Sequence, residues 1–137
     1  EESCLLTAFS SVGLPGDTGC IYHLHQIVGL AKTIELMALS PRIYGKEAFR
    51  LGLTTRLAPD GKLEEETQAF AEKLLRRPLS ALALQKQLYY EVFYRDYMAY
   101  SRLEAENLAK AGASADHREA VTAFIEGRKP KFNQRKA

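Results

Sequence analysis

The distribution of strand-like and helix-like segments along the chain most restricts its fold. Only the first third mixes apolar strand-like runs with loops, and beyond residue 59 the apolar spacing is helical throughout. The opening segment is too small for a self-contained sheet, because small isolated sheets are marginally stable in water. We therefore predict a mainly α-helical chain whose opening segment lies beside further structure.

The first third is predicted to contain several short elements. Gly29 separates two stretches of helical spacing, and Ser40-Pro41 ends the second of them. In chain order the expected elements are a strand at 5–9, a loop at 13–19, helices at 21–28 and 31–39, an extended segment at 42–44, a helical turn or two at 46–51 and a brief strand at 53–57.

The remainder is predicted to form four helices. Acidic residues begin the first and basic residues end it, as the helix dipole favours. The expected helices are 63–75, 80–95, a third capped by Asp96 that runs to Leu108, and a fourth that ends at Gly127 and begins with an acidic capping box of Asp116 and Glu119.

Length and charge limit the classes of function. The 137 residues fit one domain, and charged residues interrupt every apolar run before membrane-spanning length, so we expect no membrane partner. Five basic residues lie in the last ten positions, and the rest of the chain carries 14 basic against 17 acidic residues. An acidic body argues against nucleic acid as a partner, and the basic tail is most simply a solvated terminus.

The cysteines and histidines predict neither a disulfide framework nor a metal site. Cys4 and Cys20 lack a Cys-x-x-Cys pattern, which suits a reducing cytoplasm or organelle matrix. On a helix, His23 and His25 diverge by roughly 200° and cannot share a metal ion. His117 has no nucleophile nearby in the sequence, so we assign it no catalytic role.

Asp17 lies in the glycine-rich loop before the first helix. The loop lacks both the P-loop and the Gly-x-Gly-x-x-Gly pattern, and the charge of Asp17 opposes phosphate binding. Two roles remain open from the residue pattern. Asp17 could cap the following helix, stabilising it by roughly 1 kcal/mol, which the pattern alone favours. Alternatively, it is a general base on a rigid turn beside an apolar cavity.

Aromatic residues concentrate between residues 89 and 100, where six of the 13 in the chain occur. Core packing accounts for about half of these rings. Tyrosines on several faces of adjacent helices suit either a subunit interface or the wall of a ligand cavity, and we weigh these two interpretations equally.

A longer pattern covers almost the whole chain. Its residues are Gly13, Leu14, Pro15, Gly16, Asp17, Thr18, Gly19, Leu24, Val28, Gly29, Ala31, Glu35, Leu36, Met37, Glu47, Ala48, Leu51, Gly52, Leu53, Asp116, Glu119, Ala120, Ala123, Phe124, Glu126, Arg128, Pro130 and Phe132. In this order they resemble the C-terminal half of the enoyl-CoA hydratase/isomerase (crotonase) superfamily. We expect departures from the family at Cys20 and Gly127 to alter the acyl and nucleotide ends of the site.

The resemblance implies a crotonase-like α/β fold. Residues 1–58 would be the end of its spiral core, and residues 59–137 a helical region that forms a homotrimer or dimer of trimers and covers active sites. The chain has no initiator methionine. We expect the half with the oxyanion hole to lie upstream of Glu1, which would leave this fragment alone inactive.

The resemblance also implies an acyl-CoA thioester as substrate, with coenzyme A part of it and no separate cofactor. It makes Asp17 the proton shuttle of an isomerase, and this outweighs the capping interpretation. Phe9 falls where hydratases carry their second catalytic glutamate, and phenylalanine cannot move a proton. The implied substrate-binding residues are Phe9, Leu14, Pro15, Phe124, Arg128, Lys129 and Lys131, of which the last three would contact the CoA nucleotide. The alternatives are a hydratase and a non-catalytic oligomerisation module.

Overall fold

The structure is a computed structural model that describes residues 3–132. Arg135 and Lys136 of the basic tail lie outside the described residues. The elements in chain order are β1 (Cys4–Leu5), the 3-10 helix η1 (Ser10–Val12), α1 (Cys20–Leu39), β2 (Ile43–Tyr44), α2 (Gly45–Arg50), α3 (Leu63–Leu75), α4 (Leu79–Phe93), α5 (Tyr97–Gly112) and α6 (Ala115–Ile125).

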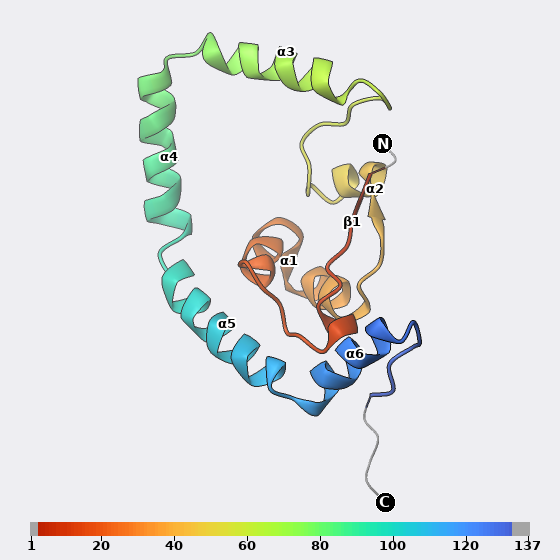
Figure 1. Ribbon diagram of the computed structural model, residues 1–137. Coiled ribbons are helices and arrows are strands. Elements are labelled where there is room, and N and C mark those ends of the chain that lie inside the picture. Colours follow the sequence, from red (N-terminus) through yellow and green to blue (C-terminus); the bar gives the residue numbers. More distant parts are fainter. Residues whose placement is uncertain (1–2, 133–137) are drawn as a thin grey trace, which may run out of the picture.

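The four C-terminal helices form an open arc around the N-terminal elements (Figure 1). Helices α3, α4 and α5 follow one another along the outside, and α6 returns beneath the inner group, where it packs on η1. Helix α1 lies inside the arc. The chain is therefore mainly helical, as the sequence predicts.

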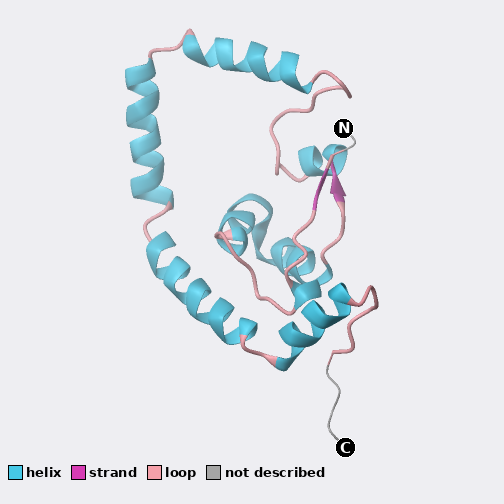
Figure 2. Ribbon diagram, viewed as in Figure 1, coloured by secondary structure: helices cyan, strands magenta, loops and turns pink. Residues whose placement is uncertain are grey.

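Strand structure within residues 3–132 is confined to the antiparallel pair β1 and β2 (Figure 2). Cys4 lies opposite Tyr44, and Leu5 lies opposite Ile43. The predicted strand at 5–9 is wrong beyond Leu5, because the chain turns at Ala8 (φ 31°) into η1. The strand predicted at 53–57 is also wrong. Those residues form bends and irregular backbone, in which the Thr54 hydroxyl donates to the Arg56 carbonyl at 2.9 Å.

The predicted helices are present, but two of their caps are wrong. Ser114 is the N-cap of α6, where its hydroxyl oxygen accepts the His117 amide at 3.1 Å, so Asp116 and Glu119 form no capping box. Asp96 occupies the N-cap position of α5 without a side-chain hydrogen bond. Gly29 (φ 76°, ψ 167°) kinks α1 into two arms at the break that the sequence predicts.

The buried core lies among the N-terminal elements. Leu36 of α1, Ile43 of β2 and Ala48 of α2 form it, and partly buried Leu51 and Leu53 pack against it. By contrast, no residue of α3, α4 or α5 is fully buried. Leu84 and Leu88 of α4 keep 63% and 58% of their surface exposed, which leaves an apolar helix face without a partner in the described chain.

Candidate active site

Asp17 lies on a sharply folded turn that leads into α1. Its carboxylate accepts a hydrogen bond from the Thr18 amide at 2.6 Å, and its carbonyl accepts one from the Thr18 hydroxyl at 2.8 Å. Thr18 has φ 55°, which is rare for a β-branched residue. Asp17 is exposed and does not cap α1, because the N-cap is Gly19. The capping interpretation is therefore wrong, and the carboxylate faces solvent on a strained turn.

Helix α5 contacts the turn that contains Asp17, Thr18 and Gly19. The buried Gly19 donates its amide to Glu104 at 3.0 Å, and the Tyr100 hydroxyl donates to the second oxygen of Glu104 at 2.7 Å. A Cβ added to Gly19 would lie 2.9 Å from the ring of Tyr97. Burial and the nearby carboxylate both raise the pKa of the Tyr100 hydroxyl, which keeps that hydroxyl a donor.

A small, mostly apolar cavity of about 200 Å³ opens beside the turn. It lies between the loop, the start of α1 and one face of α5. Its lining residues are Pro15, Gly16, Ile21, Tyr100, Leu103, Glu104 and Asn107. Pro15 and Gly16 line this cavity and Asp17 does not, so the interpretation of Asp17 as a base beside an apolar cavity stays a prediction.

The first part of the loop is held against α6. Leu14 donates its amide to the Phe9 carbonyl at 2.9 Å, and both side chains are half-buried. Gly13 (φ 69°) approaches α6 so closely that a Cβ there would lie 3.0 Å from the His117 nitrogen. The Nδ1 of His117 donates to the Val12 carbonyl at 2.7 Å. His117, to which the sequence assigned no catalytic role, therefore anchors the loop.

The aromatic residues between 89 and 100 divide into a half-buried group and an exposed group. Tyr94, Tyr97 and Tyr100 are half-buried and pack on Tyr22 of α1, with ring centroids 5.2 Å apart for Tyr22 and Tyr97. Tyr90 keeps 58% of its surface exposed. A hollow of about 330 Å³ lies among His23, Lys86, Tyr89, Tyr90, Tyr94 and Tyr97. Within this chain some of the tyrosines line a cavity, while the interface interpretation stays a prediction.

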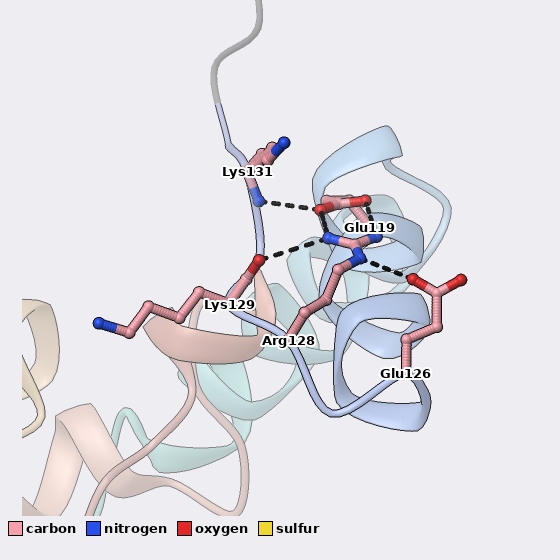
Figure 3. A network of polar contacts seen from close by, with 5 residues as sticks. All are labelled: Glu119, Glu126, Arg128, Lys129 and Lys131. Carbon is pink, nitrogen blue, oxygen red and sulfur yellow. Dashed lines mark hydrogen bonds and ion pairs between the residues drawn. The ribbon is translucent and has the colours of Figure 1, made fainter.

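Arg128 and the backbone amide of Lys131 bind the carboxylate of Glu119 (Figure 3). Arg128 binds Glu119 through two hydrogen bonds of 2.5 and 3.0 Å and Glu126 through one of 2.6 Å. The Lys131 amide also donates to Glu119, and with Arg128 it lowers the pKa of Glu119 to about 2. The ammonium groups of Lys129 and Lys131 point away from this network, so they remain available as the predicted nucleotide contacts.

The predicted site residues therefore fall into two groups. Phe9, Leu14, Pro15 and Asp17 follow one another along a segment that contacts α6 at Val12 and Gly13 and α5 at Gly19. Arg128 and the Lys131 amide bind Glu119 on α6, and the Lys129 carbonyl accepts a hydrogen bond from Arg128. Phe124 lies on the same helix with 85% of its surface exposed. The sequence missed Glu104, because its partner Gly19 lies 85 residues away and no local pattern links them.

In residues 3–132 no group of three or more histidine, cysteine or acidic side chains could hold a metal ion. Nor does this part of the chain contain a helix with the length and apolar character needed to cross a membrane.

Known proteins are similar to this chain in sequence. The enoyl-CoA hydratase/isomerase family model matches residues 1–135. A probable enoyl-CoA hydratase of Rhodobacter capsulatus is 33% identical over 98% of this chain and 52% of its own length. The 1,2-epoxyphenylacetyl-CoA isomerase of Escherichia coli is 31% identical over 91% of this chain and 48% of its own length. The chain thus spans about half the length of these relatives.

Solved structures share the fold. An enoyl-CoA hydratase from Mycobacterium avium subsp. paratuberculosis superposes with a TM-score of 0.89 at 26% identity, over 96% of this chain and 53% of the other. An enoyl-CoA hydratase/isomerase from Pseudoalteromonas atlantica gives a TM-score of 0.83 at 31% identity, over 90% of this chain and 50% of the other. These likenesses confirm the predicted crotonase-like fold. Together with the family match over nearly all of its residues, they show that the chain belongs to the enoyl-CoA hydratase/isomerase family.

Proposed function

We propose that this chain is part of an acyl-CoA-processing enzyme that moves a carbon–carbon double bond, with Asp17 as the group that carries the proton. The observation that supports this most is the carboxylate of Asp17, exposed on a turn with a left-handed threonine. Such backbone strain costs on the order of 1–3 kcal/mol and persists where surrounding contacts impose it, often at functional sites. The neighbouring cavity offers apolar surface for an acyl chain.

The proposed reaction is a proton transfer without net oxidation. The Asp17 carboxylate removes a proton from a carbon next to the double bond, and the electrons of that C–H bond shift toward the thioester oxygen, forming a dienolate. The carboxyl then returns the proton to another carbon, which moves the double bond. The two backbone amides that the family provides would stabilise the oxyanion.

One further observation favours isomerisation over hydration. Phe9 occupies the position at which the resemblance places the second glutamate of hydratases, and its ring cannot activate water. The relatives carry both kinds of name: the E. coli protein is named 1,2-epoxyphenylacetyl-CoA isomerase, and the R. capsulatus protein is named a probable enoyl-CoA hydratase.

The test is Asp17→Asn in the protein expressed from its complete coding sequence. General acid–base catalysis contributes roughly 10²- to 10⁴-fold, so we expect the kcat for conversion of 3-enoyl-CoA to 2-enoyl-CoA to fall at least about 100-fold. Asp96→Asn is the control, because Asp96 is exposed and its side chain makes no capping bond. Full isomerase activity in Asp17→Asn would refute the assignment, and hydration of 2-enoyl-CoA measured in parallel tests the hydratase alternative.

A non-catalytic assembly module is the second candidate. The exposed apolar faces of α3, α4 and α5 favour it, since large unpartnered patches commonly mark interfaces between subunits. The proposed enzyme would use the same faces to form a homotrimer. Gel filtration combined with an acyl-CoA binding measurement separates the two functions, because an assembly module should form oligomers and yet ignore the thioester.

A further inference from the structure

Glu104 makes two hydrogen bonds that reach the turn of Asp17. One carboxylate oxygen accepts the Gly19 amide at 3.0 Å and the other accepts the Tyr100 hydroxyl at 2.7 Å. Tyr100 lies one turn before Glu104 on α5, so the helix itself sets the direction of the carboxylate. Gly19 is buried, which makes its amide costly to leave without an acceptor.

The turn has few other ways to fix its direction. Thr18 and Gly19 both have positive φ angles, 55° and 75°. The hydrogen bonds within the turn join residues at most three apart, including the one from the Cys20 amide to the Asp17 carbonyl at 3.0 Å. Those local bonds define the shape of the turn but not its place relative to α5. The bond from Gly19 to Glu104 supplies that placement, and Tyr97 closes the space that any side chain at residue 19 would need.

We propose that Glu104 is a positioning residue whose carboxylate, held by Tyr100, fixes the Gly19 amide and thereby the direction of the Asp17 carboxylate. This inference rests on the proposed function of Asp17. Glu104 acts through the backbone. Because its side chain also lines the neighbouring cavity, Glu104→Gln, which keeps the size of that side chain, separates the backbone effect from a change in the cavity. A displacement of about 1 Å in a reacting group can cost on the order of 100-fold in rate, so the loss of this contact should act mainly on kcat.

The experiment compares three variants in the protein expressed from its complete coding sequence. Glu104→Ala removes both bonds, whereas Glu104→Gln keeps an oxygen for Gly19 and an amide for Tyr100. Glu106→Ala removes an exposed carboxylate from the same helix and is the control. Isomerase kinetics are measured together with hydrogen exchange at the Gly19 amide, the group that donates to Glu104, and thermal unfolding monitors the fold.

We expect Glu104→Ala to lower kcat about 10- to 100-fold with KM within about twofold, and to speed exchange at Gly19 about tenfold. Glu104→Gln should restore both quantities to within about threefold of the parent, and Glu106→Ala should change neither. Unchanged exchange in Glu104→Ala, or faster exchange with an unchanged kcat, would overturn the positioning role. Full activity in Asp17→Asn would instead overturn the proposed function, while Gly19 exchange would still report on the contact.

Discussion

Arg128 donates two parallel hydrogen bonds to the carboxylate of Glu119, from Nη1 at 2.5 Å and from Nη2 at 3.0 Å. The bidentate geometry joins the segment after α6 to the middle of that helix, and Glu126 takes the third donor at 2.6 Å. Both side chains of the bidentate pair are partly exposed, at 37% for Arg128 and 26% for Glu119. Arg128, the first cation of the basic tail, thus connects the segment after α6 to that helix. Lys129 and Lys131 are therefore the better candidates for nucleotide contacts.

The first prediction concerns the titration of Glu119. Its pKa lies at about 2, below the ordinary value of 4.5, because Arg128 and the Lys131 amide stabilise the charged form. Since the folded state lowers this pKa, the pair stabilises the fold above pH 4.5 and loses that effect as the pH falls toward 2. The carboxyl ¹³C shift of Glu119 should therefore titrate near pH 2, and its pKa should rise toward 4.5 in Arg128→Gln, in which the Lys131 amide still lowers it.

The matching stability measurement uses Glu119→Gln. At pH 7 this variant should unfold at a lower temperature than the parent, and the difference should shrink as the pH falls below 4.5. Glu126→Gln is the control, because Glu126 accepts a single bond and is 54% exposed. Equal effects of the two substitutions at pH 7 would mean that the bidentate geometry adds nothing to stability.

The second prediction concerns the cap of α6. Ser114→Ala removes the oxygen that accepts the His117 amide, so it should lower the free energy of unfolding by about 1 kcal/mol. Ser114→Asp retains an acceptor and should recover most of the loss. Asp96→Ala at the start of α5 is the comparison, since its side chain makes no capping bond and its removal should cost little. Urea denaturation measures all three, and an equal cost for Asp96→Ala and Ser114→Ala would contradict the assigned cap.

The sequence predicts the helices better than their ends. Apolar periodicity identifies α3 with its bounds and α4 to within two residues at each end. Helix α5 runs to Gly112 rather than Leu108, because the intervening Ala109, Lys110 and Ala111 all favour helix. The predicted N-caps are wrong because several neighbouring polar residues could each act as the N-cap. Only the backbone geometry selects Ser114 over Asp116.

The sequence predicts only those parts of the candidate site that depend on residues close together in the chain. Asp17 stands out because its charge opposes phosphate binding in the glycine-rich loop and because the family pattern includes it. Its supports are not local: Glu104 reaches Gly19 across 85 residues, and His117 reaches Val12 across 105. The strand predicted at 53–57 fails for a related reason, since a strand needs a neighbour and residues 3–132 provide none beside it.

The third prediction separates close packing from backbone strain at glycine. Gly13→Ala places a methyl group 3.0 Å from the His117 nitrogen and adds strain at φ 69°. Gly61→Ala adds comparable strain at φ 76° with nothing within 4 Å. Left-handed strain costs on the order of 1–2 kcal/mol, so Gly61→Ala should lose about that much and Gly13→Ala distinctly more. Equal losses in urea denaturation would show that the loop can move away from α6 freely.

The fourth prediction tests the lysines of the tail as contacts for the CoA phosphates. Their ammonium groups point away from the network around Glu119, so Lys129→Gln with Lys131→Gln removes two charges and leaves the ion pairs of Arg128 in place. Charge-assisted bonds to phosphate should make CoA binding in the double variant about 10-fold weaker and less sensitive to salt. Isothermal titration with CoA at two salt concentrations measures both effects. Lys110→Gln on α5 is the control for the loss of charge, and unchanged affinity in the double variant would show that these lysines are only a solvated tail.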